Sequence, residues 1–173
     1  MCLIIFDWQP SQKHILTLAS NRDEFHNRPS LDAHYWKDHP HIYGGRDLKE
    51  KGTWLAVSKY NRFAAVTNYR SPETESFQRS RGEIPSQFLC SQLSATAFAT
   101  MLPERKYAGY NALLFDGTQL VYCTNRDSED DKIFQHRFEA LAPGRYGLSN
   151  HLLNTPWHKV KRTKPALNKL DIL

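Results

Sequence analysis

The sequence predicts an α+β fold built from antiparallel sheets, because three pairs of short strands are interspersed with helical segments. Each strand pair is joined by a short polar connection, which is typical of a β-hairpin. Helices grouped between hairpins favour a layered arrangement with one core. The three hairpins are expected at residues 2–8 with 14–20, 53–58 with 62–67, and 110–115 with 119–124.

Two segments have helical features. Apolar side chains in residues 81–101 recur at helical spacing, with an interruption expected near Pro85 and an end before Pro103. Near the end of the chain, Thr155 has the residue type of an N-cap and Pro156 that of a first helical position. The sequence therefore predicts a broken helix in the middle and a second helix after Thr155.

The remaining segments are assigned by composition. Residues 145–149 are predicted to end a strand, whereas residues 21–52 are polar, contain several Pro and Gly residues, and are predicted to be largely loop. No linker-like stretch divides the chain, so residues 1–173 are expected to form a single domain.

The composition is that of an ordinary globular protein, with 40% hydrophobic and 24% charged residues. No apolar run approaches the roughly 18 residues of a membrane span, and no signal peptide is evident. The three cysteines, Cys2, Cys90 and Cys123, are widely spaced and odd in number, which argues against a disulfide framework. We therefore expect a cytoplasmic protein without a membrane span.

The net charge of +5 raises the question of nucleic-acid binding. Most of the basic excess lies in residues 159–171, and the rest of the chain is nearly balanced. A basic segment at the end of a chain is more often a solvated helix face than a binding stripe. No nucleic-acid partner is expected.

The start of the chain is its most informative feature. Removal of Met1 would leave Cys2 with both a thiol and a free α-amine, which can serve as nucleophile and neighbouring base. The alternative is that Cys2 is a small buried hydrophobic residue at the start of a strand. Position alone favours the second interpretation.

Polar residues end the second predicted strand. In a hairpin with the strand that follows Cys2, Asp23 would lie near the α-amine and hold its charged form, while Asn21 could form a local hydrogen bond. Alternatively, residues 21–24 form an Asx turn with solvated charges.

Several motifs, taken in order, resemble the NRDE family, which includes the transport and Golgi organisation protein 2 group. The resemblance extends from Met1 to about Val160 and is specific because many pieces occur together. They are Cys2, NRDE at 21–24, GGRD at 44–47, GTWLA at 52–56, TNYR at 67–70, SRG at 80–82, YNALL at 110–114, YGLSN at 146–150 and LNTPW at 153–157.

This family in turn resembles the cysteine N-terminal nucleophile (Ntn) hydrolases, which implies an αββα sandwich of two antiparallel sheets. It implies a hydrolase of amide or related acyl bonds, with four catalytic residues: Cys2 as nucleophile, Asp23 beside its amine, and Asn68 and Asn150 at the oxyanion. The resemblance also marks Asn21, Arg22, Glu24 and Arg46 as motif residues that could contact a ligand.

Two features depart from the amidase pattern. Ser20 stands where those enzymes place an arginine, three positions before the aspartate. The chain also ends at Leu173, whereas family members typically continue, so the sandwich is expected to be incomplete at its C-terminus. Exposed sheet edges would then favour self-association.

Two other functions remain open. A non-catalytic intracellular carrier for haem or lipid would use the same pocket without a free α-amine, and an interaction protein would use the motifs only to build its fold. His26, His34, His39 and His41 are the candidate haem or metal ligands, but their spacing matches no tight metal pattern. No metal and no obligatory cofactor are expected.

Overall fold

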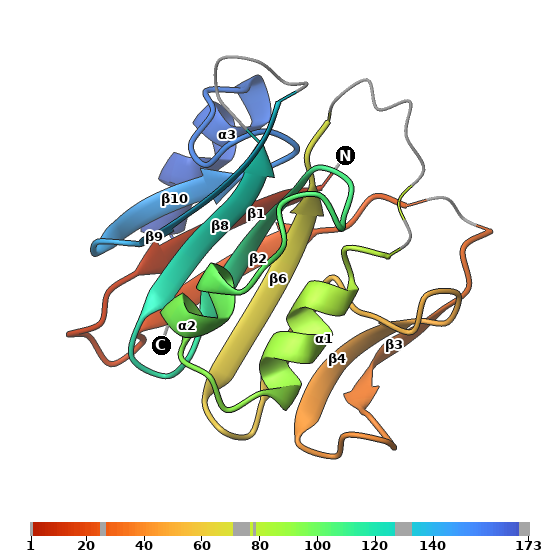
Figure 1. Ribbon diagram of the computed structural model, residues 1–173. Helices are drawn as coiled ribbons and strands as arrows, with labels where there is room; N and C mark the ends of the chain where they lie inside the picture. The colour runs from red at the N-terminus through yellow and green to blue at the C-terminus, as the bar shows by residue number, and fades with distance from the viewer. Residues whose placement is uncertain (1, 25–26, 71–76, 78, 127–132, 170–173) are drawn as a thin grey trace.

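The computed structural model describes residues 2–24, 27–70, 77, 79–126 and 133–169. Within these residues, the strands form one three-stranded and one seven-stranded sheet, both antiparallel (Figure 1). The helices lie outside the two sheets, which face each other. The α+β sandwich expected from the sequence is confirmed.

The three-stranded sheet has the order β10-β1-β2, so the first strand of the chain is its centre. Leu3 pairs with Asn21 and Ile4 with Leu148, which brings both neighbouring strands beside the start of the chain. Its strands are β1 (Leu3–Trp8), β2 (Leu16–Asn21) and β10 (Gly144–Leu148).

The seven-stranded sheet runs in sequence order from β3 to β9. Its central strands β6, β7 and β8 are almost fully buried, because both of their faces are covered. Its strands are β3 (Ser30–Tyr35), β4 (Ile42–Asp47), β5 (Leu55–Ser58), β6 (Arg62–Asn68), β7 (Tyr110–Phe115), β8 (Leu120–Arg126) and β9 (Phe134–Ala140).

Alternation along the central strands builds two cores. Phe63 and Ala65 of β6 point towards the three-stranded sheet and pack with Ile4 and Phe6. The residues between them point the other way, towards the helices. The sheets are therefore joined by one apolar layer and the outer helices by another.

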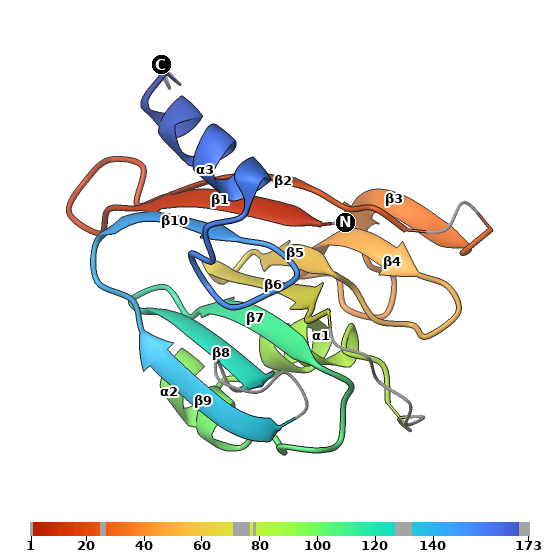
Figure 2. The ribbon, with the colours of Figure 1, turned by 90° about the horizontal axis from the view of Figure 1, so that it is seen from above.

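Helices cover both outer faces of the sandwich (Figure 2). α1 (Glu83–Cys90) packs on β5, β6 and β7, and α2 (Ala95–Thr100) packs on β8 and β9. α3 (His158–Thr163) and a 3₁₀ helix (Lys164–Lys169) cover β1 on the opposite side. The layers therefore follow the expected order of helix, sheet, sheet and helix.

The two helical predictions were wrong at their boundaries. The interruption within residues 81–101 falls between Cys90 and Ala95, whereas Pro85 lies inside the first turn of α1. A proline is tolerated there because the first N–H groups of a helix have no partner within it. α3 begins at His158, after Thr155, whose hydroxyl donates instead to the Leu152 carbonyl.

The loop-rich segment predicted at residues 21–52 also contains two strands, β3 and β4, that were not predicted. Gly44 obscured β4, since glycine normally weakens a strand. Its place is explained by packing: a Cβ on Gly44 would lie 2.6 Å from the Ala56 Cβ on the neighbouring strand. Strand β9 was missed too, because most of its side chains are exposed and polar.

Candidate functional site

The ends of four strands meet at one edge of the sandwich. β1 begins there with Cys2 just before it, β2 ends there before Asp23, β10 ends before Asn150, and β6 ends at Asn68. The pairing of β1 with both β2 and β10 places Cys2 between the other two strand ends. The structure thus brings the four predicted catalytic residues to the same edge, although they are up to 148 positions apart.

Cys2 is a half-buried free thiol held through its backbone. Its carbonyl oxygen accepts two hydrogen bonds of 2.8 Å, one from the Ser149 hydroxyl and one from the Lys159 ammonium group. Neither partner was predicted from the sequence. Ser149 lies within a recognised motif, whereas Lys159 lies in a basic segment interpreted as a solvated face.

Asp23 lies on the exposed side of this edge. Its carboxylate accepts a 2.7 Å hydrogen bond from the Asn21 side chain. The pKa of Asp23 is lowered from its ordinary 3.8, first by a hydrogen bond from the chain's terminal amino group, then by the Asn21 bond, and to a smaller extent by Lys159. Arg22 pairs with Glu24 at 3.4 Å. The NRDE segment thus combines local bonds with a carboxylate that responds to the amino terminus.

Asn68 and Asn150 are joined directly. The Asn150 side chain donates a 3.0 Å hydrogen bond to the Asn68 carbonyl, and the Asn150 carbonyl accepts one of 2.8 Å from the Arg70 backbone N–H. The Thr67 hydroxyl donates to the Ser149 carbonyl at 2.7 Å. These contacts fasten the end of β6 in one sheet to the turn after β10 in the other.

A buried polar network that was not predicted from the sequence lies beneath this turn. Asn111 is fully buried in β7, and its side-chain amide donates to the His151 carbonyl at 3.1 Å. Tyr122 donates its hydroxyl to the Asn111 side-chain oxygen at 2.7 Å and accepts from the Leu153 N–H at 3.3 Å. A single asparagine in an otherwise apolar strand was the available signal.

His151 extends the network with a defined tautomer. The Thr155 hydroxyl donates to the Leu152 carbonyl, so the His151 Nδ1–H must donate to Thr155, at 2.9 Å. His151 Nε2 then accepts from the buried Tyr69 hydroxyl, also at 2.9 Å. This assignment follows from the hydrogen-bond pattern. It ties the residue after Asn68 to the residue after Asn150.

A cavity of about 610 Å³ opens at the same edge. Cys2, Asp23 and Asn68 line it, whereas Asn21 and Asn150 are not lining residues. Arg22, Glu24 and Arg46 also contribute to its wall, and so do apolar side chains of β3 to β5. Three of the four predicted catalytic residues therefore share one space, and Asn150 supports it from behind.

Arg46 is held tightly at the cavity wall. Its guanidinium forms two hydrogen bonds to the Asp38 carboxylate, of 2.6 and 2.9 Å, and lies over the Trp36 ring at 4.0 Å. It also donates to the Lys51 carbonyl at 2.9 Å. The hydrogen bond from Arg46 lowers the pKa of Asp38 to about 2. Arg46 thus shapes the wall while most of its donors are in use.

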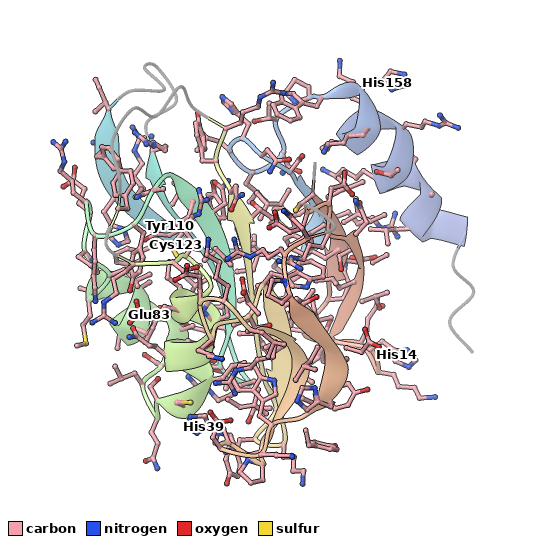
Figure 3. The ribbon with its side chains drawn as sticks, turned by 90° about the vertical axis from the view of Figure 1, so that its right-hand side faces the viewer. His14, His39, Glu83, Tyr110, Cys123 and His158 are labelled. Atoms are coloured by element: carbon pink, nitrogen blue, oxygen red, sulfur yellow. The ribbon has the colours of Figure 1, made fainter. Side chains whose placement is uncertain are left out.

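The candidate haem or metal histidines lie elsewhere, and His26 is outside the described residues. His34, His39 and His41 do not line the cavity, and His39 lies below α1 in the view of Figure 3. Among the residues that the structure describes, no three His, Cys, Asp or Glu side chains are grouped so as to hold a metal ion. Likewise, none of the described helices is long and apolar enough to cross a membrane.

Fold and site together define an αββα protein with a cavity of mixed polar and apolar lining at the edge where the chain begins. The chain belongs to the family described as Transport and Golgi organisation 2, which matches residues 1–171. It is 36% identical to the Transport and Golgi organization protein 2 homolog of Homo sapiens and 37% identical to the Mus musculus homolog, each over 92% of this chain and 60% of the relative. A further relative, Transport and Golgi organization protein 2 of Drosophila melanogaster, is 49% identical over 38% of the chain and 25% of its own length. The chain thus spans about 60% of the length of the mammalian relatives it matches.

Proposed function

We propose that this chain carries the N-terminal nucleophile site of a hydrolase that cleaves an amide or related acyl bond. The observation that supports the proposal is that Cys2 and Asp23 line one cavity, with Asp23 responding to the terminal amino group. Removal of Met1 would free the backbone nitrogen of Cys2 as a new terminal amine, one residue further along the chain. A nucleophile with an adjacent amine base is an established way to activate a thiol. A reducing cytoplasmic location, which would keep Cys2 reduced, is part of the same proposal.

The reaction has two steps. In the first, the α-amine of Cys2 takes the thiol proton while the sulfur attacks the acyl carbon, and the proton then passes to the leaving nitrogen. The products are a free amine and a thioester on Cys2. In the second, the α-amine takes a proton from water, the hydroxide attacks the thioester, and the carboxylic acid leaves as the thiol is reprotonated. Asp23 orients the amine throughout.

The tetrahedral intermediate in each step carries a negative oxygen, which needs a neutral hydrogen-bond donor. Asn68 is the better candidate donor, because it lines the cavity while Asn150 holds the Asn68 backbone. Replacing Asn68 with Ala should lower kcat by roughly 100- to 1,000-fold, as for other oxyanion donors. Asn27→Ala, at an exposed position that does not line the cavity, serves as the control and should leave kcat unchanged.

The decisive test compares two forms of the protein that differ only in Met1. One form begins at Cys2 and the other retains Met1, so both have the thiol but only the first has the adjacent amine. Both are assayed against a panel of N-acyl aminocoumarin amides, with Cys2→Ser as a further variant. Activity confined to the form that begins at Cys2 supports the proposal. Equal activity in both forms, or full activity in Cys2→Ser, contradicts the proposed mechanism.

A carrier function is the second candidate, favoured by the apolar part of the cavity wall. Leu31, Tyr43 and Val57 line the cavity and are 42–47% exposed, so they could contact an apolar ligand such as haem or a lipid. The names of the mammalian relatives refer to transport. A haem titration followed at the Soret band tests one form of this idea, with Cys2→Ala and His34→Ala as variants. An unchanged spectrum on addition of the protein contradicts haem carriage.

A further inference from the structure

A lysine from the opposite end of the chain reaches the candidate nucleophile. Lys159 lies in α3, and its ammonium group donates to the Cys2 carbonyl at 2.8 Å. α3 packs on β1, and Figure 2 shows it above the three-stranded sheet. The lysine therefore bridges the outer helical layer and the start of the chain.

α3 is seated closely enough to fix this contact. Val160, next to Lys159, is 4% exposed and packs over Gly147 of β10. A Cβ on Gly147 would lie 2.5 Å from the Val160 Cγ1, so only glycine allows this approach without displacing the valine. The neighbouring Ser149 donates to the same Cys2 carbonyl. The Cys2 carbonyl oxygen is therefore held by two donors, Lys159 from α3 and Ser149 from the turn after β10.

Lys159 interacts electrostatically with two groups of the proposed reaction, Cys2 and Asp23. Burial lowers the pKa of Lys159, while the charges of Cys2 and Asp23 raise it in opposition. Lys159 in turn lowers the pKa of Asp23. A cation beside a thiol favours the thiolate, which is the reactive form.

We propose that Lys159 is a positioning residue that fixes the Cys2 backbone through its hydrogen bond and increases the reactivity of the Cys2 thiol through its charge. The inference rests on the proposed function, because the charge of Lys159 matters for catalysis only if Cys2 is the nucleophile. Ser20 stands where the amidases place an arginine, and Lys159 would supply a positive charge at this site. The physical content of the inference concerns only Lys159 and Cys2. It can therefore be tested without a substrate.

The chain offers matched variants. Lys159→Met removes both the hydrogen bond and the charge, Lys159→Gln keeps an N–H donor without the charge, and Lys159→Arg keeps both. Lys161→Met is the control, because Lys161 belongs to the same helix but lines a separate groove with Arg145 and Lys164. All variants carry Cys90→Ser, because Cys90 is exposed while Cys123 is fully buried.

The experiment is alkylation of Cys2 by iodoacetamide between pH 6 and pH 10, read by mass spectrometry on protein that begins at Cys2. Near pH 7, Lys159→Met and Lys159→Gln should each react roughly three- to tenfold more slowly than the parent, because a nearby charge acts through a partly solvated path. Lys159→Arg should stay within about twofold, as should Lys161→Met. Thermal unfolding of each variant shows that the fold is retained.

The outcomes separate the two proposals. Slower alkylation in Lys159→Gln with rescue in Lys159→Arg supports the role of the charge, even if no amide is ever hydrolysed. Equal pH profiles for the parent and Lys159→Gln overturn that role, whatever the hydrolysis assay gives. Should Lys159→Met unfold, the profiles of Lys159→Gln and Lys159→Arg still decide the matter, since both keep a donor for the Cys2 carbonyl.

Discussion

The two sides of the candidate site are built in different ways. On the side of Asn68 and Asn150, the hydrogen bonds join residues 82 positions apart and are largely buried. On the side of the NRDE segment, the side-chain bonds join residues two positions apart and are exposed. The first side is therefore fixed by the tertiary fold. The second side is fixed by local hydrogen bonds, and its electrostatics depend on whether the terminal amino group belongs to Met1 or to Cys2.

The largest effect is expected on the buried side. Replacing Asn111 with Leu leaves the His151 carbonyl and the Tyr122 hydroxyl without their present partner. Since an unsatisfied buried polar group costs about 1–3 kcal/mol, we expect the free energy of unfolding to fall by about 2–4 kcal/mol. Urea denaturation of the parent and the variant measures this change in the free energy of unfolding.

The matched variant on the exposed side is Asn21→Ala, which removes the bond to Asp23. Its unfolding free energy should change by less than about 0.5 kcal/mol. Equal losses of unfolding free energy in Asn21→Ala and Asn111→Leu would show that the buried side does not contribute more to stability than the exposed side. The m-value should stay constant in both if the comparison is valid.

An intermediate effect is expected from a carboxylate at the opposite end of the large sheet. Burial raises the pKa of Asp116, but hydrogen bonds from the backbone N–H groups of Ala95, Gln119 and Thr118 outweigh it and lower the pKa to about 2. These bonds join the turn after β7 to the start of α2.

The sign of the pH effect follows from that lowered value. The stabilisation is complete above the ordinary pKa of 3.8 and is lost as the pH falls towards about 2. Acidification from pH 5 to pH 2.5 should therefore destabilise the parent by about 1 kcal/mol more than Asp116→Asn, after allowance for solvent screening. Denaturant titrations at the two pH values measure the difference, and parallel curves would contradict it.

The same contrast explains what could be predicted from the sequence. The hairpins were found because alternation and turn residues are local signals, and Cys2 and Asp23 were placed together because one hairpin joins them. Strand β4 was missed because the reason for glycine at position 44 is close packing against Ala56, which lies 12 positions away. No local pattern in the sequence reveals that contact. Asn111 and Lys159 were missed for the same reason: their partners lie 40 and 157 positions away. The roles implied for Asn68 and Asn150 came from resemblance, and their shared edge became visible only in three dimensions.

The smallest effect on stability is expected from Asp23→Asn, which nevertheless tests the exposed side most directly. Asp23 is exposed, so the midpoint of thermal unfolding should shift by less than about 2 °C. Because the carboxylate favours the charged form of a nearby amine, its loss should increase the uncharged fraction of the Cys2 α-amine at pH 7. Acylation of that amine by a succinimidyl ester should then become roughly two- to fivefold faster, as measured on the N-terminal peptide. Glu24→Gln removes a neighbouring carboxylate that pairs with Arg22 and should change the rate much less. If both variants react alike, Asp23 has no special relation to the amino terminus, and the exposed side of the site is only a local turn.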